Sequence, residues 1–191
     1  MILCVDVGNS NIVADLFNKD GVLQKHLRTA YTKGLCAEEY AVFLKAKLEQ
    51  AGTDIGVIRH CVLCCSNPVT RPAIFKALTE ITGKEPILFK NDKTCRLNIL
   101  TEDPNEVGVD IIASCMAAKD LYPMPCIIVD MGTATTVTGM DKDGNVLGVS
   151  ILPGMFTALN SLLEKTGLPW QENLKAEPKA IGTNTQKSME S

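Results

Sequence analysis

Long apolar runs and an excess of basic residues are both missing from this sequence. No uninterrupted apolar stretch approaches 18 residues, which excludes a membrane-spanning helix. Lys and Arg number 19 against 22 Asp and Glu, so the chain lacks the basic surface of a general nucleic-acid binder. The amino-terminal stretch Met1–Asp6 reads directly into a strand, with neither a basic region nor a cleavage site. These absences predict a cytoplasmic protein.

Histidine is scarce but cysteine is not. His26 and His60 have no ligand-like neighbours in the sequence and are interpreted as structural. The eight cysteines are scattered, and the one cluster, Cys61–Cys65, lies in an apolar run that looks like a buried strand. On a strand, Cys61 and Cys64 would face opposite sides, so they could not share a metal ion. The cluster is therefore interpreted as small core thiols.

The content of 46% hydrophobic and 21% charged residues excludes a disordered chain, and the length allows one large domain or two small ones. Apolar runs and turn residues predict strands over 2–7 and 12–17 and a third strand that ends near 28. They also predict strands over 58–65, 86–89, 126–130 and 133–140, and a last strand that ends near 151. Helical spacing predicts helices over 37–51, 70–82, from about 105 to 121, and over 155–165. This order indicates an α/β fold with mixed sheets, in two units, 1–120 and 121–191.

An internal repeat supports the division into two units. Asp130–Gly132 repeats the Asp-x-Gly of Asp6–Gly8 after 124 residues, each time at the end of an apolar strand. Val13 and Val137 keep this offset, and an Asp-Gly turn follows each copy. An Asp at an exposed strand end can hold a cation, and the Gly lets a phosphate approach the backbone. Ordinary turn chemistry explains one copy well; two copies at matched spacing favour a phosphate and metal clamp.

Five motifs in order resemble the type III pantothenate kinase family, within the actin-like ATPase and sugar-kinase superfamily. They are Asp6–Asn11, Asn105–Asp110, Asp130–Thr136, Ile151–Gly154 and Ile181–Thr185. The resemblance covers essentially the whole chain. It implies a duplicated actin-like (ribonuclease H-like) ATPase fold, with two mixed-sheet units around a nucleotide cleft. It also implies that ATP phosphorylates pantothenate, the first step of coenzyme A biosynthesis, in a homodimer.

The resemblance assigns roles to individual positions. Asp110 corresponds to the general base, Asp6 is directed toward Mg²⁺ on ATP, and Asp130 corresponds to a ligand of a monovalent cation (K⁺ or NH₄⁺). The ATP-binding positions are Asp6, Val7, Gly8, Asn9, Ser10, Asn11, Ile12, Val13 and Thr133. The substrate-binding positions are Thr101, Gly108, Val109, Asp110, Ile111 and Thr185. From the residues alone, without the resemblance, an exposed helix residue is the favoured interpretation of Asp110.

The sequence departs from the family pattern at three places. The Gly-Ala-Asp-Arg around the base reads Gly108–Ile111 here, so an Arg that could pair with the pantothenate carboxylate is an Ile. Losing such a charge-assisted contact costs about 1.5–3 kcal/mol, or roughly ten- to a hundredfold in affinity. Where the family pattern has a Gly-Gly pair, this chain has Gly148–Val149. Where the family has an aromatic residue that contacts the substrate, this chain has Thr101.

The family pattern also continues with further helices beyond Thr185, whereas this sequence ends at Ser191. We expect the second unit to be truncated and to leave an apolar sheet face uncovered. Two alternatives to a pantothenate kinase stay open at this point. One is a catalytically impaired nucleotide-binding regulatory protein or fragment of the same family. The other is a kinase for a different, less anionic hydroxy compound, which Ile111 would favour.

Overall fold

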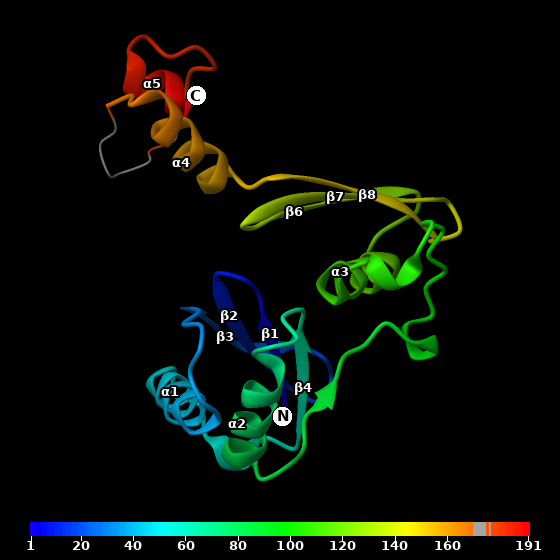
Figure 1. Cartoon of the computed structure of the whole chain (residues 1–191). Helices are drawn as coiled ribbons and strands as arrows, with labels where there is room; N and C mark the ends of the chain where they lie inside the picture. The colour runs from blue at the N-terminus through cyan, green and yellow to red at the C-terminus, as the bar shows by residue number, and fades with distance from the viewer. Residues whose placement is uncertain (170–174, 176) are drawn as a thin grey trace. The chain divides into compact units, whose positions relative to one another are not determined.

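A computed structural model describes residues 1–169, 175 and 177–191 of the chain. The chain divides into two compact units (Figure 1). The first unit contains Met1–Cys126 and Met140–Gly148, and the second contains Ile127–Gly139 and Val149–Ser191. Among the described residues, no helix is both long enough and apolar enough to cross a membrane.

The first unit is built on a five-stranded mixed sheet with the order β3-β2-β1-β4-β5. Its strands are β1 (Ile2–Val7), β2 (Asn11–Phe17), β3 (Leu23–Ala30), β4 (His60–Cys65) and β5 (Ile87–Leu88). The first three strands pair antiparallel as a meander, while β4 runs parallel to both β1 and β5. Because β1 pairs with β2 on one side and β4 on the other, it lies at the centre of the sheet.

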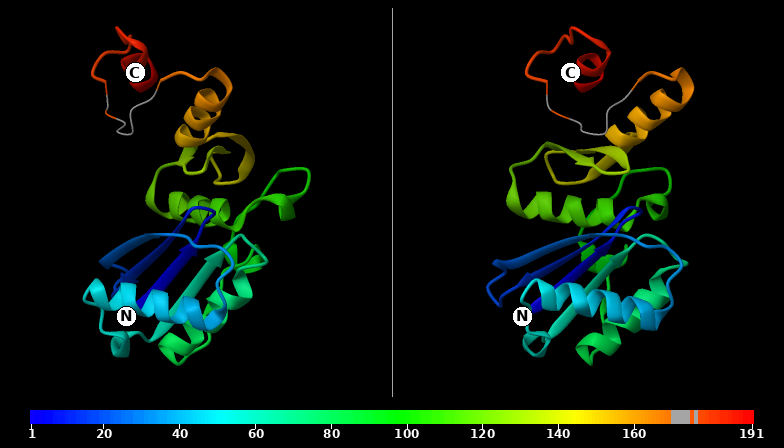
Figure 2. Two further views of the ribbon diagram at one scale, coloured as in Figure 1. Left: turned by 60° about the vertical axis from the view of Figure 1, so that its left-hand side comes forward. Right: turned by 90° about the vertical axis from the view of Figure 1, so that its left-hand side faces the viewer.

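Two helices cover one face of this sheet (Figure 2). They are α1 (Ala37–Gln50) and α2 (Arg71–Thr82), and each is followed by a glycine with positive φ, Gly52 and Gly83. Alternate residues of β1 point into the core that the helices complete, and the side chains of the residues between them lie on the other face. The core residues are Leu3, Val5, Val7, Ile12, Ala14, Leu16, Tyr40, Ala41, Leu44, Leu48, Ile58, Cys61, Leu63, Cys65, Ile74, Ala77 and Leu78.

The segment after β5 differs in detail from the sequence prediction. One helix was expected from about Asn105, but the chain forms a short 3-10 helix, Pro104–Glu106, and then helix α3 (Val109–Leu121). Gly108 has an extended ψ of 140°, which separates the two. Helix α3 lies against β4. Two further 3-10 helices span Ile55–Val57 and Lys93–Cys95.

The second sheet has three strands, in the order β6-β7-β8. Its strands are β6 (Cys126–Met131), β7 (Ala134–Met140) and β8 (Val146–Pro153), and helices α4 (Met155–Thr166) and α5 (Thr185–Glu190) follow. Apolar side chains of β6 are largely exposed, Ile127 by 72% and Val129 by 56%. These exposed residues are apolar, and the mixed first sheet with its covering helices confirms the α/β prediction.

Candidate functional site

The first Asp-x-Gly stretch closes a tight turn between β1 and β2. The Gly8 N–H donates to the Asn11 carbonyl at 3.0 Å, and the Tyr31 N–H donates to the Ser10 carbonyl at 2.9 Å. The side chains of Val7 and Ile12 are buried in the core, whereas Asn9 and Ser10 are exposed. The turn is therefore anchored at both ends and presents polar residues at its tip. Val7 and Ile12 could meet a ligand only through their backbone.

The strand register places four side chains in one row across the first sheet. Arg28 of β3 lies opposite Val13 of β2, Val13 lies opposite Asp6 of β1, and Asp6 lies opposite Cys64 of β4. Directly opposed residues share a face, so this row lies on the face away from the α1 and α2 core. The row puts a carboxylate, a thiol and a guanidinium-bearing residue on one surface.

Asp110 lies in the first turn of α3 and its side chain is exposed. The Ile111 N–H donates to Asp110 Oδ1 at 3.0 Å, so the start of the helix orients the carboxylate. A Cβ built on Gly108 would overlap Asp110 Oδ1. The absence of a side chain at residue 108 is thus a condition for this orientation of Asp110.

Two of the carboxylates predicted for the site, Asp6 and Asp110, affect the Cys64 thiol. Burial raises the pKa of the Cys64 thiol, and the negative charge of Asp6, a hydrogen bond with Asp6 and the charge of Asp110 raise it further. Asp6 and Asp110 therefore both act on the same thiol, although they are far apart in the sequence. Carboxylate oxygens of this kind suit Mg²⁺, which one or two carboxylates and phosphate oxygens commonly hold.

The cysteine interpretation is confirmed for Cys61 and Cys65, which are 2% and 1% exposed. Burial, followed by the charge of Cys4, raises the pKa of Cys61 to about 12. Cys64 is only partly buried and lies on the opposite face, beside Asp6. Its link to the site was missed because the sequence alone does not show which residue of β1 lies opposite it. Arg28 was missed in the same way, because the sequence alone does not show which residue of β2 lies opposite it.

The second Asp-x-Gly stretch forms the turn between β6 and β7 in the second unit. The Gly132 N–H donates to the Ala134 carbonyl at 3.0 Å. The Thr133 carbonyl accepts from the Gly154 N–H at 3.1 Å and from the Thr157 hydroxyl at 2.7 Å. A Cβ on Gly154 would overlap the Gly132 carbonyl. The start of α4 is thus packed on this turn, and Asp130 precedes it with an exposed side chain.

Two predicted substrate-binding threonines lie on short local structures. Thr101 is in a bend, and its buried hydroxyl oxygen has no hydrogen-bond partner among the described residues. Thr185 begins α5 and is exposed. Asn184 caps this helix, because its Oδ1 accepts from the Lys187 N–H at 2.9 Å.

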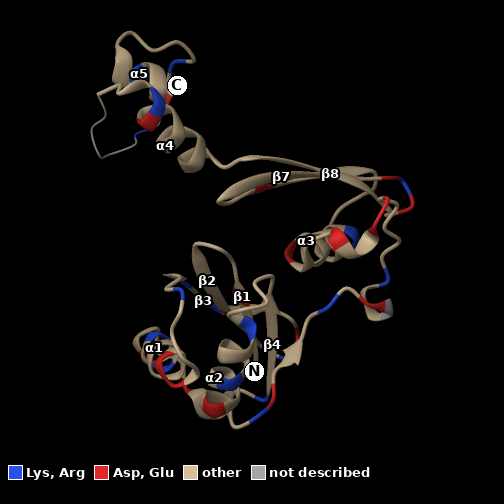
Figure 3. Ribbon diagram, in the orientation of Figure 1, with Lys and Arg blue, Asp and Glu red and all other residues tan. Residues whose placement is uncertain are grey.

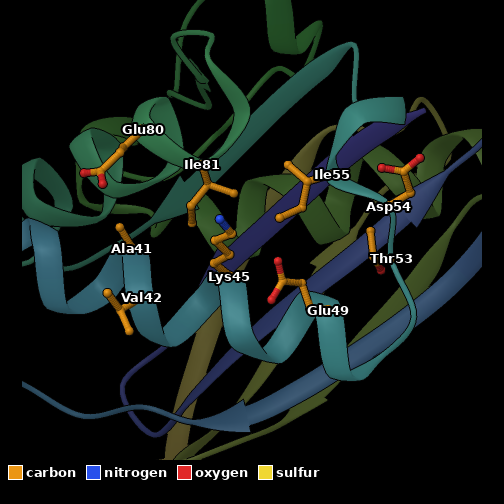
Figure 4. A pocket seen from close by; sticks show the side chains of 9 residues that line it. All are labelled: Ala41, Val42, Lys45, Glu49, Thr53, Asp54, Ile55, Glu80 and Ile81. Atoms are coloured by element: carbon orange, nitrogen blue, oxygen red, sulfur yellow. The ribbon is translucent and has the colours of Figure 1, made fainter.

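A pocket of about 490 Å³ in the first unit contains none of these residues. It lies between α1, α2 and the segment 53–55 (Figure 4). Figure 4 shows one basic residue in its lining, Lys45, together with Glu49, Asp54 and Glu80. Three carboxylates against one ammonium group do not suit a polyphosphate.

The strands of the second sheet carry one charged residue, Asp130 (Figure 3).

Comparison with known sequences points to one family. The family model described as type III pantothenate kinase matches residues 2–191. A type III pantothenate kinase of Moorella thermoacetica is 33% identical over 185 residues, which are 97% of this chain and 72% of the relative. Another from Legionella pneumophila is 33% identical over 193 residues, covering 100% and 74% of the two chains. One from Thermomicrobium roseum is 30% identical, covering 100% and 73%.

Solved structures support the fold. A Campylobacter jejuni protein described as a Baf family transcriptional activator aligns with a TM-score of 0.57 at 18% identity, over 98% of this chain and 71% of that one. A Sinorhizobium meliloti protein described as a 2-dehydro-3-deoxygalactonokinase aligns with a TM-score of 0.51 at 16% identity, over 87% and 57%. The expected actin-like and sugar-kinase fold is thereby confirmed.

Proposed function

This chain belongs to the type III pantothenate kinase family, and we propose that it transfers the γ-phosphoryl group of ATP to the primary hydroxyl of pantothenate. The products are 4′-phosphopantothenate and ADP, in the first step of coenzyme A biosynthesis. The observation that supports this most directly is that Asp6 lies opposite Cys64 of β4 and that α3, which carries Asp110 in its first turn, lies against the same strand. Two carboxylates that suit this reaction are therefore carried by elements that adjoin β4 in the first unit.

Asp110 acts as the general base in this proposal. Its carboxylate takes the proton of the pantothenate hydroxyl while that oxygen forms a bond to the γ-phosphorus and the bond to the ADP oxygen breaks. The exposed position of Asp110 leaves it accessible to a substrate, and the Ile111 N–H holds one of its oxygens. Phosphoryl transfer depends mainly on positioning and charge neutralisation, so a carboxylate suits this role.

The residues that we assign to ATP binding belong to the two Asp-x-Gly turns. The first runs through Asp6–Val13, with exposed polar residues at its tip, and the second contributes Thr133. Asp6 would face Mg²⁺, which when bound would neutralise charge on the ATP phosphates. Asp130, whose carboxylate is exposed near the end of β6, is assigned to K⁺ or NH₄⁺ by the family resemblance.

Pantothenate is bound beside Asp110. Gly108, Val109 and Ile111 line its site and Thr101 makes a further contact, while Thr185 is assigned to substrate binding by the family resemblance alone. Ile111 cannot pair with the pantothenate carboxylate, so we expect affinity roughly ten- to a hundredfold below that of a chain with Arg at this position. The variant Ile111→Arg tests this directly, because it should lower the KM for pantothenate and leave the KM for ATP unchanged.

We also propose a cytoplasmic homodimer. The exposed apolar side chains of the second sheet support self-association, because a large uncovered apolar face is an association surface. Sedimentation across a range of concentrations tests the dimer.

The deciding experiment is ADP release from Mg·ATP in the presence of K⁺, with and without pantothenate. The proposal expects ADP release that depends on pantothenate. Asp110→Asn should abolish turnover while leaving ATP binding nearly intact, because the amide cannot accept the proton. Asp120→Asn, also exposed and on the same helix, is the matched control and should keep full activity. An active Asp110→Asn variant would remove Asp110 as the base, and ATP binding without pantothenate-dependent ADP would refute the kinase.

A further inference from the structure

We propose that Cys64 is a positioning residue, whose thiol donates a hydrogen bond to the Asp6 carboxylate and fixes the orientation in which Asp6 meets a metal–nucleotide complex. This inference rests on the proposed function in one respect, namely that Asp6 faces the metal ion. It assigns a role to a side chain that the reaction itself does not use.

The geometry follows from the pairing of β1 with β4. Asp6 lies directly opposite Cys64 in this parallel pair, and the next pair along the strands is Val7 with Cys65. Val7 and Cys65 are each 1% exposed and lie in the core. Because a shift of either strand by one residue would turn its core side chain outward, the register is strongly held. Asp6 and Cys64 are therefore kept side by side on the other face.

The chemistry of the two groups determines the direction of the hydrogen bond. An ionised carboxylate can only accept, whereas a thiol is a weak donor and is protonated at neutral pH. The S–H group of Cys64 must then be the donor and Asp6 the acceptor. The Asp110 charge acts on the same thiol. The hydrogen-bond donor at residue 64 is thus subject to the charges of both Asp6 and Asp110. An apolar side chain at residue 64 would remove this donor from the Asp6 carboxylate.

The test separates the donor from the volume of the side chain. Cys64→Ser keeps a donor, Cys64→Ala removes it, and Cys64→Val removes it while keeping the space filled. Cys4→Ala is the matched control, since Cys4 lies on the same strand face two residues before Asp6 and pairs with Val62 instead. For each variant, binding of a non-hydrolysable ATP analogue is titrated at a series of Mg²⁺ concentrations and once without Mg²⁺.

We expect Cys64→Ala and Cys64→Val to raise the Mg²⁺ concentration at half-saturation by about three- to tenfold, the effect of one modest hydrogen bond. Cys64→Ser and Cys4→Ala should stay within about twofold of the unaltered protein on the same scale. Binding without Mg²⁺ should be unchanged in all four, which a merely structural role would not produce.

Several outcomes would overturn the inference. One is a Val variant that matches the unaltered protein, because the donor would then be dispensable. Another is equal weakening of binding with and without Mg²⁺, which would indicate a packing role. If Cys64→Ala fails to fold, the Val and Ser variants still decide. The proposed function fails separately: a chain that binds Mg²⁺ and nucleotide but releases no ADP with pantothenate is no pantothenate kinase, yet it still tests Cys64. A chain that binds no nucleotide at all refutes both.

Discussion

The two meanders of this chain have the same local structure and opposite environments. Leu3, at the start of β1, is fully buried, whereas Ile127, at the equivalent point of β6, is 72% exposed. The same contrast separates Val5, 2% exposed, from Val129, 56% exposed. In the first meander, α1 and α2 supply the partner surface. Local sequence is thus enough to form the strands, while burial depends on what packs against them.

The structure also locates the length difference between the two copies. Strands β1 and β6 are offset by 124 residues, but β2 and β7 are offset by 123, so the shorter segment is the turn between them. The turn has three residues in the first copy, Gly8–Ser10, and two in the second, Gly132–Thr133. Val13 therefore corresponds to Thr136, and its match with Val137 was wrong. From the sequence alone, the residue that the second copy lacks was located after the return strand, whereas it is missing from the turn before that strand.

The second turn of each copy is nearly identical. Asn18 Oδ1 accepts from the N–H groups of Asp20 and Val22, each at 2.9 Å. Asp141 Oδ1 accepts from those of Asp143 and Asn145, again at 2.9 Å. Gly21 and Gly144 both have a φ of 76°. The copies thus retain the same side-chain-to-backbone turn with Asn in one and Asp in the other.

The largest expected effect comes from truncating equivalent apolar residues in the two meanders. Leu3→Ala should cost about 2–5 kcal/mol of unfolding free energy, because it opens a cavity in a closed core. At protein concentrations below those at which the proposed dimer forms, Ile127→Ala should change it by no more than about 0.5 kcal/mol, because the side chain is exposed in the single chain. Urea unfolding of both variants measures the difference. A large loss for Ile127→Ala would mean that this face is covered in solution, by a second copy or another partner.

A smaller effect is expected from the glycines at the two turns. Gly154→Ala should cost about 1–3 kcal/mol, since its Cβ meets backbone atoms of Gly132 and Thr133 that cannot move aside cheaply. Gly8→Ala should leave stability nearly unchanged, because its Cβ would lie 3.5 Å from the Asn11 carbonyl, an ordinary contact. It should nevertheless weaken ATP binding, if the phosphates approach this backbone. Thermal unfolding and nucleotide titration give the two readouts, with Gly148→Ala, which has open space, as the control.

The smallest effect separates the Asn and Asp turns by pH. The N–H and side chain of Asn145 hold the pKa of Asp141 below its usual 3.8, so folding favours the ionised form. The stability that ionised Asp141 contributes is present above its pKa in the unfolded chain and is lost as the pH falls through its lower pKa in the folded protein. Asp141→Asn should therefore reduce the loss of Tm between about pH 6 and pH 3, and Asn18→Asp should increase it. Identical acid sensitivity in all three proteins would contradict this assignment.

Periodicity and turn residues were enough to predict the main strands and helices, because they are local properties. Helix α2 ends where Gly83 predicts, and α4 begins after Gly154. The break before α3 was missed because it depends on the backbone angle of Gly108. The proximity of Cys64 to Asp6 was missed for a different reason. It depends on the register between strands more than fifty residues apart, which no local pattern encodes.

That same pairing has a consequence for the order in which the first unit folds. Hairpins such as β1–β2 close within roughly microseconds, since their strands adjoin in the sequence. The β1–β4 ladder, which sets Ile2 beside His60, must first close a long loop and therefore forms later. We therefore expect the Asp6–Cys64 contact to form after the β1–β2 hairpin. A partly folded chain with only its hairpins in place has the first phosphate turn but not the neighbour that orients its carboxylate.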